Sequence, residues 1–188
     1  METLHRPSRA SNVTLRVGTV YEIDALCEID NDAVELFTRA GLDMDLPLDH
    51  EFFAAERARW LRSLLSGRTL LAAAPSGRIL GFAASGTVDG EPYLDQLSVR
   101  TQFMRLGIGT ALLTATAHRA RDDGASALGL TTYNHLSWNR PFYERAGFSV
   151  VPELKCGPEM LAVLAHERRW LPLPEQRVAM RMRLLAER

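Results

Sequence analysis

The sequence predicts an α/β (mixed α+β) fold: a central mixed, mostly antiparallel sheet of about seven strands with helices on both faces. Three observations lead to this prediction. The chain has 188 residues, which is enough for one globular domain. The spacing of its apolar residues switches between the helical and the strand period. Adjacent strands in the middle of the chain are followed by alternating helices and strands. We expect residues 1–12 to be a polar arm and residues 13–188 to be the domain.

The chain is predicted to begin with one strand and two helices. Val13–Thr19 alternates apolar and polar residues, which is typical of a half-buried strand. From Tyr21 to Ala40 apolar residues recur every three or four positions, and Gly41 follows where a helix prefers glycine. A second helical pattern covers Phe52–Leu65.

In the middle of the chain the period of the apolar residues changes to two. Strands are predicted at Thr69–Ala74, Ile79–Val88 and Pro92–Val99. The last two flank an Asp-Gly pair, Asp89–Gly90, a strong hairpin signal. The rest of the chain predicts helices at Gly107–Asp122, Ser137–Ala146 and Pro158–Trp170, and strands at Leu128–Tyr133, Phe148–Pro152 and Val178–Leu184.

Composition excludes several classes of function. The 22 Lys and Arg residues are balanced by 23 Asp and Glu, so the basic excess of a nucleic-acid-binding protein is absent. The longest apolar run, Leu70–Ala74, is too short to span a bilayer, and the first residues lack the apolar core of a signal peptide. Cys27 and Cys156 stand alone, so neither a metal cage nor a disulfide framework is encoded. We expect a cytoplasmic protein without metal, nucleic-acid or membrane partners.

Two glycines mark the turn from the Pro92–Val99 strand into the next helix. Gly107 and Gly109 have no Cβ, so a ligand can approach the backbone closely. The free N–H groups that begin a helix attract phosphate, and Arg105 adds a charged donor. The third glycine of a dinucleotide turn is replaced by Leu112, and no Walker lysine follows Gly109. From these residues alone, a tight turn without a ligand is the alternative.

Two segments resemble a known family. LDQLSVRTQFMRLGIGTALL, at residues 94–113, resembles the acetyl-CoA signature of the GNAT superfamily of acetyltransferases. TTYNHLSWNRPFYERAGF, at residues 131–148, is similar to its companion segment. The predicted order of elements is also that of the GNAT fold. The match departs from the family at Met104, where Gln or Arg is usual.

The resemblance implies a binding site for acetyl-CoA as cosubstrate. It assigns the acetyl carbonyl and the pantetheine arm to backbone N–H groups of Leu97, Ser98 and Val99, at a point where this strand diverges from its neighbour. It assigns an amide contact to Asn139, with a helix-capping or surface role as the alternative, and it adds Phe142 to the site. The diphosphate is assigned to the turn made by Met104, Arg105, Leu106, Gly107, Ile108, Gly109 and Thr110.

The resemblance also names two catalytic residues. Tyr143 occupies the position of the general acid that protonates the departing thiolate, with a packing tyrosine as the alternative. Asp95 is the first candidate for the base, because similar polyamine acetyltransferases carry an acid there; others carry it one position later, where this chain has Gln96. Alternate strand residues point to opposite faces, so we expect only one of these two to face the site. Glu91, His135 or water are the other candidate bases.

The resemblance places the acceptor under the first two helices. We expect an N-acetyltransferase that acts on a primary amine, on a small molecule, by direct attack in a ternary complex. The alternatives are a non-catalytic acetyl-CoA-binding sensor and a protein or peptide N-acetyltransferase. The last strand suggests pairing with a second subunit in a homodimer. Five aspartates predict an acidic rim that favours a cation: Asp30, Asp32, Asp43, Asp45 and Asp49. Three aromatic residues are candidates for an acceptor wall or for the core: Phe52, Phe53 and Trp60.

Overall fold

A computed structural model describes residues 13–43, 46–47 and 49–184 of the chain. The predicted arm, residues 1–12, and Asp45 of the predicted acidic rim lie outside the described residues.

The described helices and strands follow the predicted order. The strands are β1 (Thr14–Val17), β2 (Thr69–Ala73), β3 (Ile79–Val88), β4 (Glu91–Val99), β5 (Ala127–Tyr133), β6 (Ser149–Val151) and β7 (Arg177–Arg183). The helices are α1 (Ile23–Arg39), α2 (Glu51–Leu65), α3 (Ile108–Asp122), α4 (Arg140–Arg145) and α5 (Pro158–Trp170). Short 3-10 turns join several of them.

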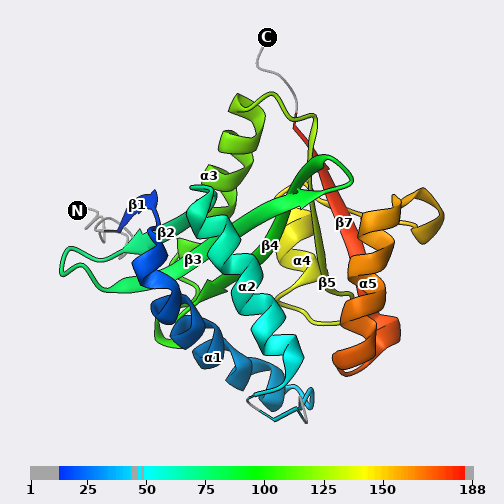
Figure 1. The fold of residues 1–188 in the computed structure, drawn as a ribbon, viewed down its shortest axis with the longest axis horizontal. Coiled ribbons are helices and arrows are strands. Elements are labelled where there is room, and N and C mark those ends of the chain that lie inside the picture. The colour runs from blue at the N-terminus through cyan, green and yellow to red at the C-terminus, as the bar shows by residue number, and fades with distance from the viewer. Residues whose placement is uncertain (1–12, 44–45, 48, 185–188) are drawn as a thin grey trace, which may run out of the picture.

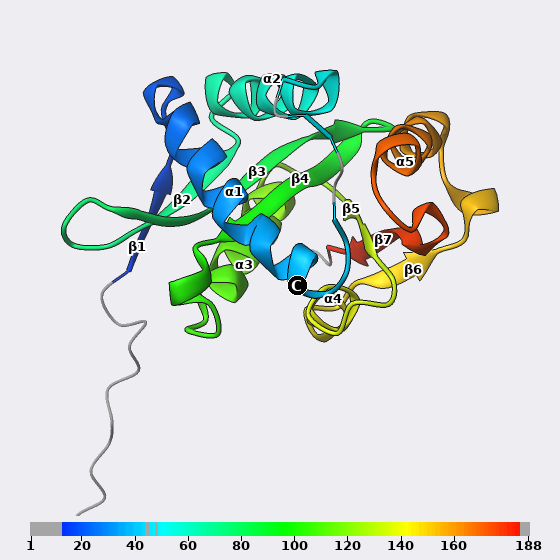
Figure 2. The same ribbon diagram turned by 90° about the horizontal axis from the view of Figure 1, so that it is seen from below.

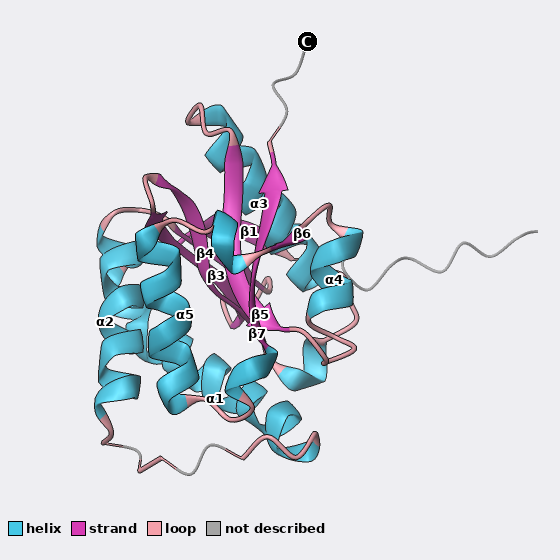
Figure 3. Cartoon of the chain, turned by 90° about the vertical axis from the view of Figure 1, so that its right-hand side faces the viewer, coloured by secondary structure: helices cyan, strands magenta, loops and turns pink. Residues whose placement is uncertain are grey.

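The strands form one seven-stranded sheet in the order β1-β2-β3-β4-β5-β7-β6 (Figure 1). All neighbouring strands are antiparallel except β4 and β5, which are parallel. Figure 2 shows α1 and α2 on one face and α3 and α4 on the other, and Figure 3 shows α5 beside α2. This confirms the mixed, mostly antiparallel sheet with helices on both faces.

Each face of the sheet has its own apolar core. On one face, Leu112 and Leu113 of α3 pack against strand residues such as Leu128. On the other face, Trp60 of α2 is 3% exposed, and its ring centroid lies 5.5 Å from that of Phe82. Trp60 therefore belongs to the core and not to an acceptor wall.

The last strand is not the free edge that a dimer interface would need. β7 pairs with β5 along its whole length and with β6 over residues 179–181. The expectation that β7 pairs with a second subunit is therefore wrong over that stretch, because the short β6 occupies its outer edge.

A bulge in β4 changes which side chains share a face. Ala84 pairs with Gln96 while its neighbour Ser85 pairs with Leu94, so Asp95 is an extra residue in β4. Asp95 bonds Arg59 of α2 and Gln96 bonds Asp30 of α1, so both side chains point to the same face. The expectation that they point to opposite faces is wrong, because strict alternation fails at a bulge.

β4 and β5 diverge after a single registered pair, Tyr93 with Gly129. The N–H of Arg100 donates to the carbonyl of Leu80 in β3 at 2.8 Å. Because alternate residues of an antiparallel strand direct their N–H groups the same way, those of Leu97 and Val99 point away from β3 into the gap beside β5. The divergence that the resemblance implied is present.

The hairpin between β3 and β4 fixes the start of α5. The Asp89 carboxylate accepts the backbone N–H groups of Glu159 and Met160 at 2.9 and 3.1 Å. The side chain thus satisfies two donors of the first helical turn, as an N-cap does, although it comes from a distant loop. Among the described residues, no helix has the length and apolar character needed to cross a membrane.

Candidate active site

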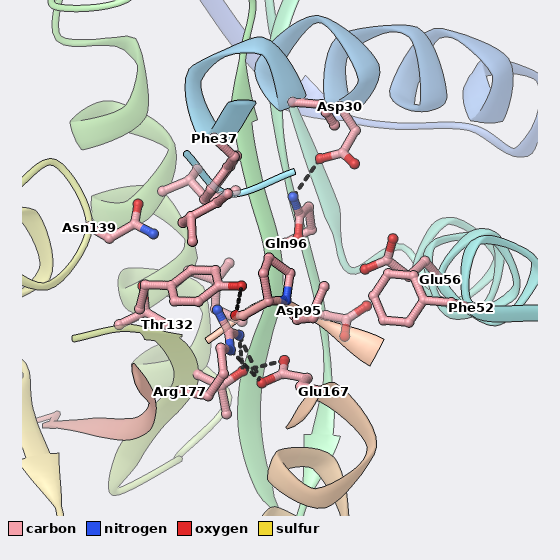
Figure 4. Close-up of a pocket in the computed structure, with 18 of the residues that line it drawn as sticks. Asp30, Phe37, Phe52, Glu56, Asp95, Gln96, Thr132, Asn139, Glu167 and Arg177 are labelled. Carbon is pink, nitrogen blue, oxygen red and sulfur yellow. Dashed lines mark hydrogen bonds and ion pairs between the residues drawn. The ribbon is translucent and has the colours of Figure 1, made fainter. Parts of the chain in front are cut away.

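A cavity of about 170 Å³ lies where α1, α2, β4, β5, α5 and β7 meet. Figure 4 shows the side chains that enter it from these elements, among them Asp30 from α1, Glu56 from α2, Glu167 from α5 and Arg177 from β7. Asp95 and Gln96 both reach it because of the β4 bulge. The cavity therefore gathers residues from both halves of the sequence.

Four carboxylates among the described residues line the cavity, and three of them are hydrogen-bonded within the protein. Asp30 accepts from Gln96 at 2.5 Å and from the Ser98 hydroxyl at 2.8 Å. Asp95 accepts from the Nε of Arg59 at 2.9 Å. Burial raises the pKa of both aspartates, while Arg59 acts in the opposite direction on the pKa of Asp95.

The third hydrogen-bonded carboxylate belongs to Glu167. It accepts from Arg177 at 2.8 Å and from the hydroxyl of Thr131 at 2.6 Å. Arg177 is itself largely buried, so this ion pair is a fixed part of the cavity wall.

Glu56 is the fourth carboxylate, and no motif in the sequence predicts it. Its nearest cation is the guanidinium of Arg59, with an Nη2–Oε1 distance of 3.5 Å. Burial, reinforced by the charge of Asp30, raises the pKa of Glu56 to about 8. Phe52, Glu56 and Arg59 are spaced i, i+4, i+7 on one face of α2, which is the only sequence signal that links Glu56 to the site.

Tyr143 and Asn139 line the same cavity from α4 and the turn before it. In the part of the chain that the structure describes, the Tyr143 hydroxyl has no hydrogen-bond partner in the protein. Its ring packs edge-on against Phe142 and Phe148, and burial raises its pKa to about 12. The backbone carbonyl of Asn139 begins α4, but its side chain makes no capping hydrogen bond.

The turn into α3 presents a row of free amides. Gly107 stands before the helix with φ +84°, and Arg105 also has a positive φ of 60°. Within the described ranges, the N–H groups of residues 105–110 donate no hydrogen bond to the protein; the first helical bond runs from Ala111 to Gly107. Such a row at the positive end of a helix suits an anionic phosphate.

Two neighbours of the turn differ in their roles. Phe142 lies beside it, since a Cβ on Gly109 would be 3.8 Å from its ring. Met104 is a packing residue: its side chain contacts the core under α3 and its N–H donates to Thr101 at 3.2 Å. Its amide is therefore not free for a ligand, and the expectation that Met104 binds the cofactor through its backbone is not met.

The two other candidate bases lie outside the cavity. Glu91 is at the far end of β4, where it accepts from Ser126 at 3.1 Å and lies 3.6 Å from Arg181. His135 is exposed and packs edge-on against Tyr133. Neither lines the cavity.

Most of the predicted acidic rim also lies elsewhere. Of the described aspartates in that group, only Asp30 lines the cavity. Asp32 instead accepts the N–H of Thr101 at 2.5 Å, and Asp43 and Asp49 are exposed. The cavity's aromatic residues include Phe52, as expected, and Phe37, which was not expected; Phe53 does not line it.

Comparison with known proteins identifies the family of this chain. A model of the acetyltransferase (GNAT) family matches residues 24–148. The PaiA N-acetyltransferase from Thermoplasma acidophilum, solved in complex with coenzyme A, is 15% identical with a TM-score of 0.66, and the match covers 91% of this chain and 98% of that one. A GNAT-family acetyltransferase from Staphylococcus aureus Mu50 is 14% identical with a TM-score of 0.68, over 92% of this chain and 99% of that one.

The ribosomal-protein-S18-alanine N-acetyltransferase from Escherichia coli is 16% identical with a TM-score of 0.60, over 94% of this chain and 96% of that one. At such identities the likeness concerns the fold, whereas the family model spans the chain from α1 through α4 to Phe148, including the free amides and Tyr143. The chain therefore belongs to the acetyltransferase (GNAT) family and is an acyl-CoA-dependent acetyltransferase.

Proposed function

We propose that this protein transfers the acetyl group of acetyl-CoA to a primary amine on a small molecule, by direct attack within a ternary complex. The observation that carries the proposal is the continuity of three features. The free amides before α3 lead to the gap between β4 and β5, and the strand residues at that gap line the cavity that holds Tyr143 and the carboxylates. The solved PaiA complex with coenzyme A supports the choice of cofactor.

In this proposal the diphosphate of the cofactor binds the turn before α3. The N–H groups of residues 105–110 are the donors, and the guanidinium of Arg105 adds a charge. Gly107 adopts φ +84° without strain, and the missing side chain at Gly109 leaves the backbone open next to Phe142. Met104 is left out, because its amide is already used.

The pantetheine arm and the acetyl carbonyl are proposed to lie in the gap between β4 and β5. The N–H groups of Leu97 and Val99 point into it, and fixed donors of this kind stabilise a developing oxyanion. Ser98 does not share this role, because its hydroxyl is held by Asp30 and its N–H points towards β3. Asn139, whose side-chain amide is not used in capping, lines the cavity next to the arm.

Tyr143 is the proposed general acid. When the amine nitrogen bonds to the carbonyl carbon, the carbon–sulfur bond breaks and the sulfur leaves with the electron pair. The phenol of Tyr143 has no hydrogen-bond partner among the described residues, and its pKa of about 12 keeps it protonated at neutral pH. It can therefore donate to the departing sulfur, which ends as a thiol.

The cavity supports a small, cationic acceptor. Its volume of about 170 Å³ suits a small molecule. Among the described residues that line it, four acidic side chains stand against two guanidinium groups, with Glu56 only partly ionised at neutral pH. Asp95, turned towards the cavity by the bulge and paired with Arg59, contributes to the field that attracts an ammonium group.

The test is thiol release from acetyl-CoA with a panel of alkylamines, amino sugars and peptides that carry a free amino terminus. We expect release with small alkylamines and none above background with the peptides. Release with peptides alone would replace the small-molecule acceptor with a protein one. Binding of acetyl-CoA without release across the panel would favour a sensor.

A further inference from the structure

We infer that Glu56 takes the proton from the ammonium group of the acceptor, and that the acceptor binds as an alkylammonium cation. The inference rests on the proposed function, which it deepens by naming the residue and the charge state of the substrate. An alkylamine is almost entirely protonated at pH 7 and has no free lone pair, so transfer to a thioester requires a proton acceptor beside it.

The hydrogen bonds in the cavity leave Glu56 available for this role. Asp30, Asp95 and Glu167 each accept at least one hydrogen bond from the protein. Glu56 accepts none from the residues that the structure describes. Arg59, its nearest cation, donates its Nε to Asp95 and approaches Glu56 only to 3.5 Å. The Glu56 carboxylate thus keeps lone pairs for a ligand.

The position of Glu56 also fits. It lies one helical turn after Phe52, a residue that is 2% exposed and forms part of the cavity wall. Figure 4 shows Glu56 next to Phe52, on the side of the cavity towards Asp30 and Gln96. Tyr143 lines the same cavity from α4, on the opposite face of the sheet from α2. An amine in the cavity would therefore have a base on one side and an acid on the other.

The surroundings of Glu56 bring its proton affinity close to that of an amine. The charged groups facing it are Asp30 on α1, Arg59 on α2, Asp95 on β4, Glu167 on α5 and Arg177 on β7. With the pKa of Glu56 at about 8, the equilibrium constant for proton transfer from an alkylammonium to Glu56 is about 1/250. For a carboxylate with an ordinary pKa the same equilibrium constant is about one in a million.

The inferred step is balanced. Glu56 accepts one proton from the ammonium, and the freed lone pair forms the bond to the carbonyl carbon. The nitrogen, which then carries two hydrogens and a positive charge, loses its second proton to water and becomes the amide nitrogen. The carbon–sulfur bond breaks, and the sulfur takes the proton of Tyr143. Exchange with water returns both side chains to their starting states.

The experiment compares Glu56→Gln with wild type and with Glu51→Gln, an exposed glutamate in the first turn of the same helix. The probes are n-butylamine, which is a cation at pH 7, and 2,2,2-trifluoroethylamine, which is mostly neutral there. With n-butylamine at pH 7, Glu56→Gln should lose about 10²- to 10⁴-fold in kcat/KM, and Glu51→Gln should match wild type. The loss should shrink towards pH 10, where free amine becomes abundant. With trifluoroethylamine the loss should be under tenfold.

The contrary outcomes are distinct. A loss that is equal at every pH and with both amines would show a structural role for Glu56, and no loss would remove it from the mechanism; either overturns the inference. If wild type binds acetyl-CoA and acetylates trifluoroethylamine but not n-butylamine, the cationic acceptor is wrong while acetyl transfer stands. If wild type does not bind acetyl-CoA, the proposed function itself fails.

Discussion

At the scale of single residues, burial raises the pKa of two side chains in the cavity, and this suits one of them to accept a proton and the other to donate one. It raises the pKa of Glu56 to about 8, so that about a tenth of the side chain is ionised at pH 7 and can accept a proton. It raises the pKa of Tyr143 to about 12, where a phenol keeps its proton. In the proposed reaction the first is therefore the base and the second the acid.

Replacing Tyr143 with Phe tests the acid. The variant keeps the ring packing against Phe142 and Phe148 but removes the phenol that donates to the sulfur in the proposed reaction. We expect kcat to fall by about 10²- to 10⁴-fold, with the Kd for acetyl-CoA within about threefold of wild type. Tyr21→Phe is the matched control, because Tyr21 is 92% exposed. Turnover at the wild-type rate would exclude Tyr143 as the acid.

The raised pKa of Glu56 also predicts how stability depends on pH. In the unfolded chain Glu56 loses its proton near pH ~4.3, whereas in the folded protein it keeps it to about pH 8. Between these values the folded state binds more protons, so this group lowers the free energy of unfolding as pH rises. Glu56→Gln, which does not titrate, should gain ~2 kcal/mol or more relative to wild type between pH 5 and pH 8.5. Urea unfolding at the two pH values measures this; a difference independent of pH would contradict it.

At the scale of elements, β4 has two irregular features that shape the site. The bulge turns Asp95 and Gln96 towards the same helices, and the early divergence from β5 leaves backbone donors of Leu97 and Val99 facing a gap. A third feature lies at the other end of the strand, where Asp89 caps α5, the helix that carries Glu167 into the cavity.

The cap can be tested with a double-mutant cycle. Asp89→Ala removes two acceptors from the first turn of α5 and should cost ~0.5–2 kcal/mol of stability. Gly157→Ala should also destabilise the protein, because a Cβ there would overlap the Asp89 carboxylate. In the double variant the overlap is gone, so the combined loss should be smaller than the sum of the single losses. Additive losses in thermal unfolding would mean that the two residues act separately.

At the scale of the whole molecule, the two parts of the sheet are joined by one registered strand pair. Strands β1–β4 lie on one side of the divergence and β5, β7 and β6 on the other; among the described residues, the strand pairing across it is that of Tyr93 with Gly129. The proposed cofactor site uses β4 and α3 from the first part and α4 from the second. Bound acetyl-CoA would therefore connect the two parts.

Ligand-linked stability tests this arrangement. Acetyl-CoA at 100 times its Kd should add ~2.7 kcal/mol to the free energy of unfolding, which corresponds to a rise in Tm of roughly 5–11 °C for a domain of this size. ATP and NAD at equal concentration should give a much smaller shift. A shift with ATP or NAD but none with acetyl-CoA would show that the amides before α3 hold another phosphate compound.

The order of the helices and strands, and the turn with free amides, followed from the sequence by itself. Periodicity, Asp89–Gly90 and the glycines around residue 107 are local signals, and local backbone preferences set where each element begins and ends. The motif at residues 131–148 likewise predicted that Tyr143 and Asn139 belong to one site, and both line the cavity.

Only the tertiary structure decided which charged groups line the cavity and how they are protonated. The bulge at Asp95 depends on pairing with β3, and the hydrogen-bond partners of Asp30, Asp95 and Glu167 lie on other elements. Glu56 looks like any surface glutamate in the sequence, because its spacing fits the exposed side of a helix as well as the cavity side. Its pKa depends on burial and on the charge of Asp30, and both arise only when α1 and α2 pack over the sheet.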